Sequence, residues 1–356
     1  MAERVMMKGN EAIAEGAIRA GCRIFCGYPI TPQNEIPEYM SRRMPEVGGV
    51  FIQAESEVSA INMVYGAAGA GARAMTSSSS PGVSLKMEGI SYAAGAELPL
   101  VVVNVCRGGP GLGGLTPSQA DYFQATKGGG HGDYRLIVFA PSSVQECLDM
   151  MLDAFVAADK YRNPAMLLAD GLLGQMMEPV TITEVADLQI PPKPWATTGM
   201  VPGKPQSVIN SLGLPGNLLE VINMRLQKKY QEIEAAEVRF EEENTDTADL
   251  VIVAYGTSAR IAKSAIDKVR AQGKKVGLFR PVTLWPFPSK RINELAKAGK
   301  RFLVVEMSVG QMIEDVKLAT NGQTSIEFFG RLNGAVPSVN EVYDAILKSF
   351  TGQGVA

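Results

Sequence analysis

The chain has 356 residues, 46% of them apolar and 20% charged, and a formal net charge of −3. This length suggests two globular domains, and an acidic balance without a long basic run argues against a nucleic-acid partner. No apolar run reaches the roughly 18 residues of a membrane span, and the N-terminus lacks a signal-peptide pattern, so we expect a cytoplasmic protein with no membrane contact.

The first stretch with a clear structural meaning is residues 22–32. The apolar run 22–26 predicts a buried strand, and residues 27–32 predict a sharp turn after it. Because Pro37 is tolerated only in the first turn of a helix, the next helix should begin shortly before it. Thr31 therefore lies in the strand-to-helix turn, where its hydroxyl can face a ligand.

Strands and helices then alternate. We expect strands at 50–52, 72–76, 98–105, 136–140 and 165–169, helices at 57–70, 84–96 and 144–158, and a loop at 77–82. The run 98–105 is almost unbroken in its apolar character, which is typical of a parallel sheet covered on both faces. The pattern predicts an α/β domain with a doubly wound, mostly parallel sheet.

A change of composition at Glu178 predicts a domain boundary. An extended proline-rich connection and a polar helix over 216–240 follow it, and then a second, smaller α/β domain. The strands expected in that domain are 250–254, 276–279, 302–305 and 326–329. We therefore divide the chain into residues 1–178, 179–245 and 246–356.

Cysteine and histidine usage makes a metal site in this chain improbable. The four cysteines lie in apolar segments without a C-x-x-C pair, and His131 is the single histidine. We interpret the cysteines as buried thiols and expect no metal ligands here.

A glycine-rich loop at 109–114 matches the dinucleotide-binding pattern G-x-G-x-x-G. The context differs from that pattern, because Pro117 intervenes before the next helix. Asp133, the acid about 20 positions on, precedes a strand instead of ending one. A flexible loop closing over another ligand is the favoured interpretation, and a nucleotide site remains the alternative.

Two charged residues are candidates for chemistry. Arg107 follows a buried strand beside the glycine loop, where it could bind a carboxylate through two parallel hydrogen bonds or be an ordinary surface charge. Glu55 and Glu57 lie at the start of a helix, where the helix dipole stabilises negative charges. The helix beyond Glu57 is nearly all apolar or small, so its first turn should be buried, and a buried carboxyl group can hold a proton for a ring nitrogen.

These segments resemble the α subunit of 2-oxoacid:ferredoxin oxidoreductases over nearly the whole chain. The most specific motifs are Gly27-Tyr28-Pro29-Ile30-Thr31-Pro32, Glu55-Ser56-Glu57, Arg107-Gly108-Gly109-Pro110 and the loop over 280–288. The serine loop Ser77-Ser78-Ser79-Ser80-Pro81-Gly82 is similar to that of the branched-chain type, which acts on 3-methyl-2-oxobutanoate (ketoisovalerate). Oxidation of 2-oxoglutarate or pyruvate is the alternative within the family. No second cation for a dicarboxylate such as 2-oxoglutarate is obvious, although Lys86, after the serine loop, could serve.

The resemblance implies the pyrimidine-binding domain of a thiamine diphosphate enzyme, followed by a transketolase-C-terminal-like domain. Glu57 would bond the pyrimidine ring and activate the cofactor, with Pro29 and Ile30 also against it. Thr31, Arg107 and Tyr28 would bind the substrate, Thr31 also taking part in catalysis.

The resemblance also implies partner subunits. A Gly-Asp-Gly element for Mg²⁺ and the diphosphate is missing, the nearest match being Ala169-Asp170-Gly171. A β subunit would supply that half, and γ and ferredoxin-like subunits would carry [4Fe-4S] clusters. Coenzyme A and ferredoxin would be co-substrates. The competing hypothesis is a noncatalytic α/β scaffold or nucleotide-binding subunit.

Overall fold

The computed structural model describes residues 3–183, 188, 190–200, 202–203, 205–332 and 334–351. Its first unit is built on a seven-stranded sheet of order β12-β6-β7-β5-β4-β2-β3. The strands are β2 (Ile24–Gly27), β3 (Val50–Gln53), β4 (Ala74–Ser78), β5 (Val101–Cys106), β6 (Ile137–Phe139), β7 (Ala165–Asp170) and β12 (Thr283–Trp285). All are parallel except β12, which runs antiparallel to β6.

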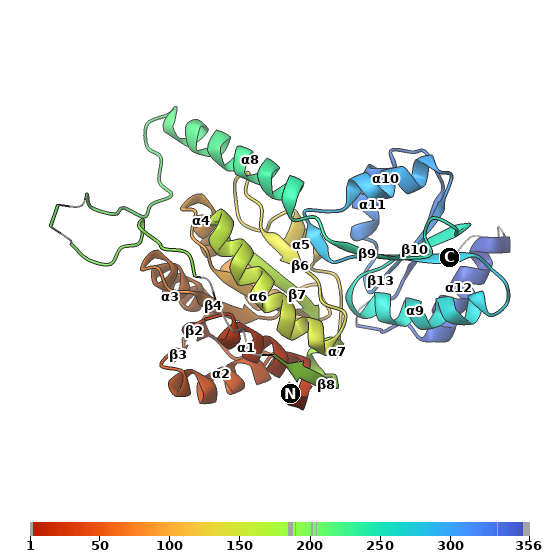
Figure 1. The fold of residues 1–356 in the computed structure, drawn as a ribbon, viewed down its shortest axis with the longest axis horizontal. Coiled ribbons are helices and arrows are strands. Elements are labelled where there is room, and N and C mark those ends of the chain that lie inside the picture. Colours follow the sequence, from red (N-terminus) through yellow and green to blue (C-terminus); the bar gives the residue numbers. More distant parts are fainter. Residues whose placement is uncertain are drawn as a thin grey trace.

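Helices cover both faces of this sheet, which confirms the predicted doubly wound fold (Figure 1). On one face α1 (Gly9–Arg19) packs against α2 (Glu35–Glu46) and α6 (Val144–Tyr161). On the other face α3 (Glu57–Gly69) packs against α4 (Ser80–Gly95). Two short helices, α5 (Tyr122–Thr126) and α7 (Gly171–Gln175), lie near the carboxyl ends of the strands. Because both faces are covered, every residue of β5 and β7 is buried.

A second, five-stranded sheet has the order β14-β13-β10-β11-β9. Its strands are β9 (Phe240–Glu243), β10 (Leu250–Val253), β11 (Val276–Pro281), β13 (Arg301–Glu306) and β14 (Ile326–Gly330). On one face α9 (Gly256–Arg270) packs against α12 (Val339–Thr351), and on the other α10 (Ser289–Lys297) packs against α11 (Met312–Thr320). The smaller α/β unit that the sequence predicts is therefore present.

Several predicted elements need correction. The sequence did not predict the first strand: β1 (Glu3–Lys8) pairs antiparallel with β8 (Met177–Ile182), which runs into what the sequence suggested was an extended connection. The polar helix α8 (Leu218–Ala236) ends before Phe240, and the acidic run that follows forms β9 against β11. Part of the proline-punctuated loop over 280–288 is the strand β12.

The serine loop is also shorter than predicted. β4 extends through Ser78, and α4 begins at Ser80 with a proline in its first turn, where a missing N–H costs nothing. The residues that were expected to lie in a loop are therefore held by a strand end and a helix start.

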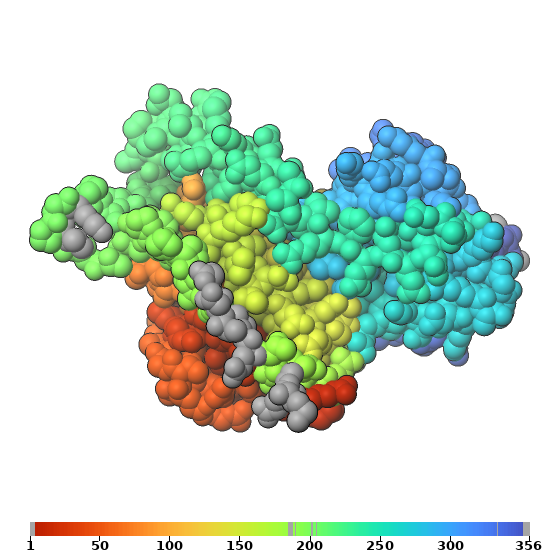
Figure 2. Space-filling view, in the orientation of Figure 1, coloured from red at the N-terminus to blue at the C-terminus, as the bar shows by residue number. Residues whose placement is uncertain are grey.

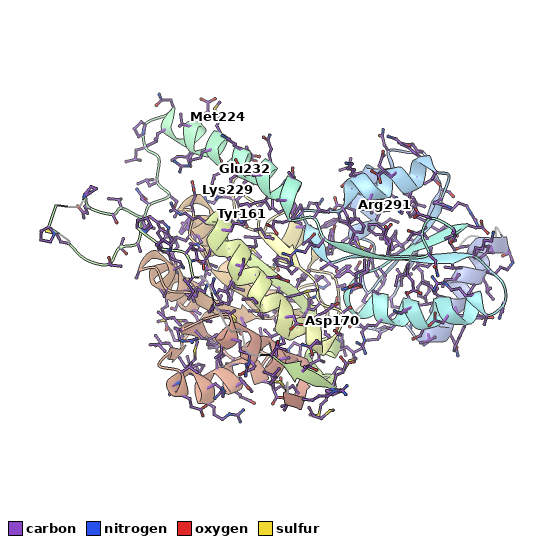
Figure 3. All side chains as sticks on the ribbon, in the orientation of Figure 1. Tyr161, Asp170, Met224, Lys229, Glu232 and Arg291 are labelled. Carbon is purple, nitrogen blue, oxygen red and sulfur yellow. The ribbon has the colours of Figure 1, made fainter. Side chains whose placement is uncertain are left out.

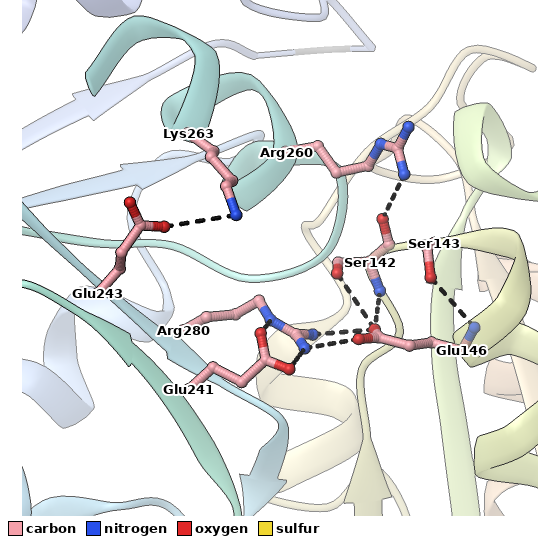
Figure 4. Close-up of polar contacts among 8 residues, drawn as sticks. All are labelled: Ser142, Ser143, Glu146, Glu241, Glu243, Arg260, Lys263 and Arg280. Atoms are coloured by element: carbon pink, nitrogen blue, oxygen red, sulfur yellow. Dashed lines mark hydrogen bonds and ion pairs between the residues drawn. The ribbon is translucent and has the colours of Figure 1, made fainter. Parts of the chain in front are cut away.

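The two units meet at the carboxyl ends of their strands. Gln119 of the first unit donates from its backbone to Met307 O (2.9 Å) and from Nε2 to Tyr255 O (2.9 Å). Arg280 on β11 reaches Glu146 on α6 through two hydrogen bonds of 3.0 and 2.7 Å (Figure 4). Figure 2 shows the second unit, in cyan and blue, lying directly against the first.

All four cysteines are buried and unpaired, as the sequence predicts. None of the described helices combines the length and apolar character of a membrane span.

Candidate active site

The turn over 27–32 joins β2 to α2, and buried side chains of neighbouring elements hold it through hydrogen bonds. Gln33 is fully buried, donates to Tyr28 O (3.4 Å) and accepts a hydrogen bond from Ser77 Oγ on β4 (2.5 Å). Asn10 Nδ2 donates to Pro32 O (2.8 Å) from α1. Sequence reasoning did not select Gln33 or Asn10, because their partners are far along the chain.

Thr31 lies in this turn, before α2, as predicted. The side chain is exposed, and its hydroxyl accepts a weak hydrogen bond from Asn34 Nδ2 (3.3 Å). Tyr28, Pro29 and Ile30 precede it; Tyr28 is 36% exposed, and Ile30 is half-buried. The turn therefore presents a hydroxyl and a tyrosine ring to the space outside the sheet.

Glu57 is the first residue of α3 and is only 6% exposed. Ser56 caps this helix by accepting a hydrogen bond from Ser59 N (3.2 Å), which fixes the start of the first turn. Glu55 is exposed and bonds Ser59 Oγ. The burial of Glu57 agrees with the prediction, and it separates this carboxylate from the solvated one two residues earlier.

Gly82 keeps the space beside the Glu57 carboxylate open. A Cβ at this position would lie 2.5 Å from Glu57 Oε1 and 2.2 Å from Ser78 Oγ, too close for any side chain. The hydroxyls of Ser78 and Ser79 are buried and have no hydrogen-bond partner among the described residues. A free carboxylate, a glycine cradle and unpartnered hydroxyls are features that a bound polar ring can satisfy.

Arg107 is buried at 6% exposure, so it is not a surface charge. Its guanidinium donates to Thr31 O (2.9 Å) and to Leu112 O (3.0 Å), which brings together the β2 turn and the glycine loop. Its Nε is buried without a partner among the described residues. The structure therefore unites Thr31 and Arg107, two of the predicted site residues.

A small polar network links Arg107 to the start of α4. Ser80 Oγ accepts from Arg107 N (3.0 Å) and donates to Asp121 Oδ2 (2.6 Å). Asn104 on β5 donates to the same carboxylate oxygen (2.9 Å) and accepts from Ser80 N (3.1 Å). The first turn of α4 thus lies between Arg107, which contacts Ser80, and Glu57, which contacts Gly82. The serine motif was noticed in the sequence, but the roles of Asn104 and Asp121 were not.

A cavity of about 390 Å³ opens beside Arg107, between the two units. Its walls include Ser80, Arg107, Asp121 and the glycine loop from one unit, and Met307, Val309 and Leu332 from the other. Among the described residues that line it, Arg107 is the cation. The glycine loop closes on itself, since Gly114 N donates to Gly108 O (2.8 Å), and no helix begins within it. The loop therefore does not have the geometry of a dinucleotide fingerprint.

Lys86 does not line this cavity, which corrects its suggested role as a second cation there. It is fully buried on α4, and its Nζ donates to Thr76 Oγ1 on β4 (3.0 Å). Burial lowers the pKa of Lys86 to about 8, although the nearby Glu57 carboxylate acts in the opposite direction.

Asp170, the nearest match to a metal-binding aspartate, has a structural use. Its carboxylate caps α7 by accepting from Leu172 N (3.0 Å) and Leu173 N (3.1 Å). It lies on the side of the first sheet that faces the second unit (Figure 3). Burial raises the pKa of this carboxyl group.

The sequence and the fold of this chain are similar to those of known proteins. Residues 15–245 match the family model described as pyruvate flavodoxin/ferredoxin oxidoreductase, thiamine diphosphate-binding, and residues 248–342 match core domain II of pyruvate:ferredoxin oxidoreductase. The chain is therefore of the thiamine diphosphate-binding class of α/β proteins.

The relatives identify the family within this class. The chain is 54% identical to a ketoisovalerate oxidoreductase subunit VorB of Methanothermobacter marburgensis, with 95% of each chain covered. It is 37% identical to a 2-oxoglutarate synthase subunit KorA of the same organism, over 98% of this chain and 99% of the relative. The chain belongs to the 2-oxoacid:ferredoxin oxidoreductases and is a subunit of such an enzyme.

A solved 2-oxoglutarate:ferredoxin oxidoreductase from Magnetococcus marinus, with 2-oxoglutarate, coenzyme A and succinyl-CoA bound, has the same fold. The TM-score is 0.88 at 27% identity, and the match covers 98% of this chain and 65% of that one. A split-gene transketolase matches at a TM-score of 0.59 and 13% identity, which is a likeness of fold.

Proposed function

We propose that this chain supplies the pyrimidine-binding half of a thiamine diphosphate site in a heteromeric cytoplasmic enzyme. That enzyme would convert 3-methyl-2-oxobutanoate, coenzyme A and oxidised ferredoxin to an acyl-CoA, CO₂ and reduced ferredoxin. The observation that carries the proposal is the buried Glu57 carboxylate, kept accessible by Gly82. When bound, thiamine diphosphate supplies the carbon nucleophile and the electron sink that decarboxylation needs.

The proposed roles of this chain's residues follow from their positions. Glu57 would share a proton with a nitrogen of the pyrimidine ring, with Pro29 and Ile30 packing nearby. Arg107 would bind the carboxylate of the 2-oxoacid, because a guanidinium suits a planar anion. Thr31 and Tyr28 would contact the substrate from the β2 turn, with the Thr31 hydroxyl close to the reacting carbon.

The choice of substrate rests on the cavity and the relatives. Its described walls offer the single cation Arg107 and the apolar side chains Met307, Val309 and Leu332, which suit a branched aliphatic monocarboxylate. The relatives at 54% and 53% identity are named for ketoisovalerate. A panel of 2-oxoacids assayed with a viologen dye should give the highest kcat/KM for 3-methyl-2-oxobutanoate; a preference for 2-oxoglutarate or pyruvate would overturn this choice.

The remaining parts of the reaction would come from partners. We propose a β subunit with the diphosphate and Mg²⁺ half, and γ and ferredoxin-like subunits with [4Fe-4S] clusters. The use of Asp170 as a helix cap supports the first of these, because that carboxylate is already engaged. For domain organisation we propose units at 1–178 and 246–356, joined by 179–245, with β9 and β12 as strands that pair across these boundaries.

Replacing Glu57 tests the catalytic proposal against a scaffold function. In the reconstituted complex, Glu57→Gln should lower kcat by about 10³-fold or more, since the amide cannot exchange the proton. Assembly should be retained. Glu55→Gln is the matched control, because Glu55 is exposed on the same segment and should leave kcat unchanged. Full activity of the Glu57→Gln complex, or turnover by the isolated chain, would refute the proposal.

A further inference from the structure

A fully buried lysine lies directly behind Glu57. Lys86 follows Gly82 by one turn of α4, so both face α3. Its Nζ donates to Thr76 Oγ1 (3.0 Å) and lies 3.4 Å from the backbone oxygen of Glu57. The ammonium is therefore held at the base of the turn that carries the Glu57 carboxylate.

This ammonium is costly for the fold. Its hydrogen bonds go to one hydroxyl and, at longer range, one carbonyl oxygen, and burial lowers the pKa of Lys86 to about 8. A methionine of similar length would fill the same space without removing a charge from water, so packing does not explain a lysine here. An electrostatic effect on a neighbouring group explains the lysine.

The groups around Lys86 identify the neighbour on which its charge acts. Glu57 faces it from α3 and Cys26 from β2, while Thr76 of β4 is its neutral hydrogen-bond partner. Burial raises the pKa of the Cys26 thiol, which therefore stays neutral near pH 7. The Glu57 carboxylate is left as the anion on which the ammonium acts.

We propose that Lys86 is a positioning residue: its ammonium holds the first turn of α3, and its charge favours the ion pair between Glu57 and a protonated pyrimidine nitrogen. The inference rests on the proposed role of Glu57. It needs no further reactant, because the proton would stay within the hydrogen bond between Glu57 and the ring nitrogen, and Lys86 would keep its own.

The direction of the pH dependence follows. Below about pH 8 Lys86 is charged. As pH rises through 8, Lys86 loses its proton, and Glu57 loses its cationic neighbour. The wild-type complex should therefore show a fall in kcat centred near pH 8 that a complex without Lys86 lacks.

The test uses the reconstituted complex with Lys86→Met and Lys86→Gln. Thiamine diphosphate labelled with ¹⁵N at the pyrimidine nitrogen reports protonation of that atom through its chemical shift, independently of turnover. We expect both variants to shift the resonance toward the unprotonated position and to lower kcat about 10- to 100-fold at pH 7. The dissociation constant of the cofactor should stay within about threefold of wild type, because the loss falls on the reacting state.

Two further variants separate charge from packing. Thr76→Val removes the hydrogen bond and keeps the ammonium, so the ¹⁵N resonance should stay near the wild-type position. Lys229→Met is the matched control. Lys229 on α8 (Figure 3) is a half-buried lysine whose pKa burial also lowers to about 8, and it donates to Arg162 O (3.1 Å). This variant should leave the resonance and the pH profile unchanged.

The outcomes distinguish the two proposals. An unchanged ¹⁵N shift and an unchanged fall near pH 8 in Lys86→Gln, with Glu57→Gln still inactive, would overturn the role of Lys86 alone. An active Glu57→Gln complex would overturn the proposed function. A shifted resonance in both Lys86 variants but not in Lys229→Met would support the inference.

Discussion

Arg107 shows how one side chain can organise a site before any ligand arrives. Its guanidinium is bonded to Thr31 O and Leu112 O, one from the β2 turn and one from the glycine loop. Leu112 itself is 84% exposed, so the residue that provides this second contact lies in an exposed part of the glycine loop. In the proposed site, a substrate carboxylate that replaced the Leu112 carbonyl on the guanidinium would leave the Thr31 contact in place.

At the residue scale we therefore predict a selective effect of Arg107→Ala. The KM for the 2-oxoacid should rise about 100-fold, equivalent to about 2–3 kcal/mol for a lost charged hydrogen-bond pair. Cofactor binding should be retained, because Glu57 and Gly82 are untouched. Steady-state kinetics and cofactor titration of the reconstituted complex measure both.

Two comparisons control this prediction. Arg107→Lys keeps the charge but not the paired geometry and should fall between wild type and Arg107→Ala. Arg135→Ala removes an arginine whose hydrogen bonds go to the backbone oxygens of Lys127 and Tyr134, and it should leave KM unchanged. An unchanged KM in Arg107→Ala would remove Arg107 from the substrate site.

At the element scale, α4 connects the chemistry to the sheet. Its first turn contacts Arg107 through Ser80, its next residues leave room for Glu57 at Gly82, and one turn later it places Lys86 behind α3. A further turn on, Gly89 lets the two helices approach, since a Cβ there would lie 2.8 Å from Ile61. Gly82, Lys86 and Gly89 share the face toward α3, while Ser80 lies on the opposite side toward Arg107, so a single helix sets four separate contacts.

The sequence predicted the central strands and most helices because each carries its own pattern. The buried runs at β5 and β7 and the apolar stripe of α6 are local signals. Thr31, Glu57 and Arg107 were found in the same way, since each follows a recognisable strand or opens a helix. Their placement is confirmed, while their roles remain predictions.

The missed elements depend on partners far along the chain. β1 exists because β8 pairs with it, and β12 lies between prolines and is a strand only against β6. Phe240–Glu243 is too acidic to signal a strand, yet it pairs with β11, where Arg280 lies opposite Glu241. Asn104 and Asp121 were missed because a shared hydrogen-bond partner, Ser80, reveals them only in three dimensions.

Arg280 gives a stability prediction at this scale. It is 3% exposed and joins β11 to α6 through Glu146, with a further pair to the largely exposed Glu241 (Figure 4). Arg280→Met should lower the free energy of unfolding of the isolated chain by about 2–4 kcal/mol, because Glu146 is left without its buried partner. Urea unfolding followed by circular dichroism measures this.

Arg291 is the matched control for that experiment. It also pairs with acids, Glu242 and Asp246, but within the second unit and at greater exposure. Arg291→Met should cost no more than about 1 kcal/mol. Equal losses in the two variants would show that Arg280 does not fasten the units together.

At the scale of the whole molecule, an apolar surface lies next to the proposed site. Large apolar side chains on α3 and α4 are exposed: Val58 (44%), Met63 (39%), Leu85 (55%) and Tyr92 (38%). Val58 follows Glu57 directly. The partner that we propose to complete the cofactor site would approach Glu57 from outside, and this surface is suited to receive it.

We predict that Val58→Glu combined with Leu85→Glu prevents assembly with the partner subunits while leaving the isolated chain folded. Both side chains point outward, so the melting temperature of the isolated chain should change by less than about 2 °C. Leu318→Glu is the control, at a 77% exposed position on α11. Sedimentation analysis measures assembly. A double variant that assembles fully would show that the partner subunits contact another surface.

The strands β9 and β12 give the molecule a property that neither unit has alone. Residues 240–243, which precede the second unit, form the outer edge of its sheet, and residues 283–285, which lie within it, form the outer edge of the first. One edge strand of each sheet therefore comes from outside the unit to which that sheet belongs. It pairs with backbone groups that could otherwise pair with another chain. The two units are interlocked, and a cut between them would leave both β6 and β11 with a bare edge.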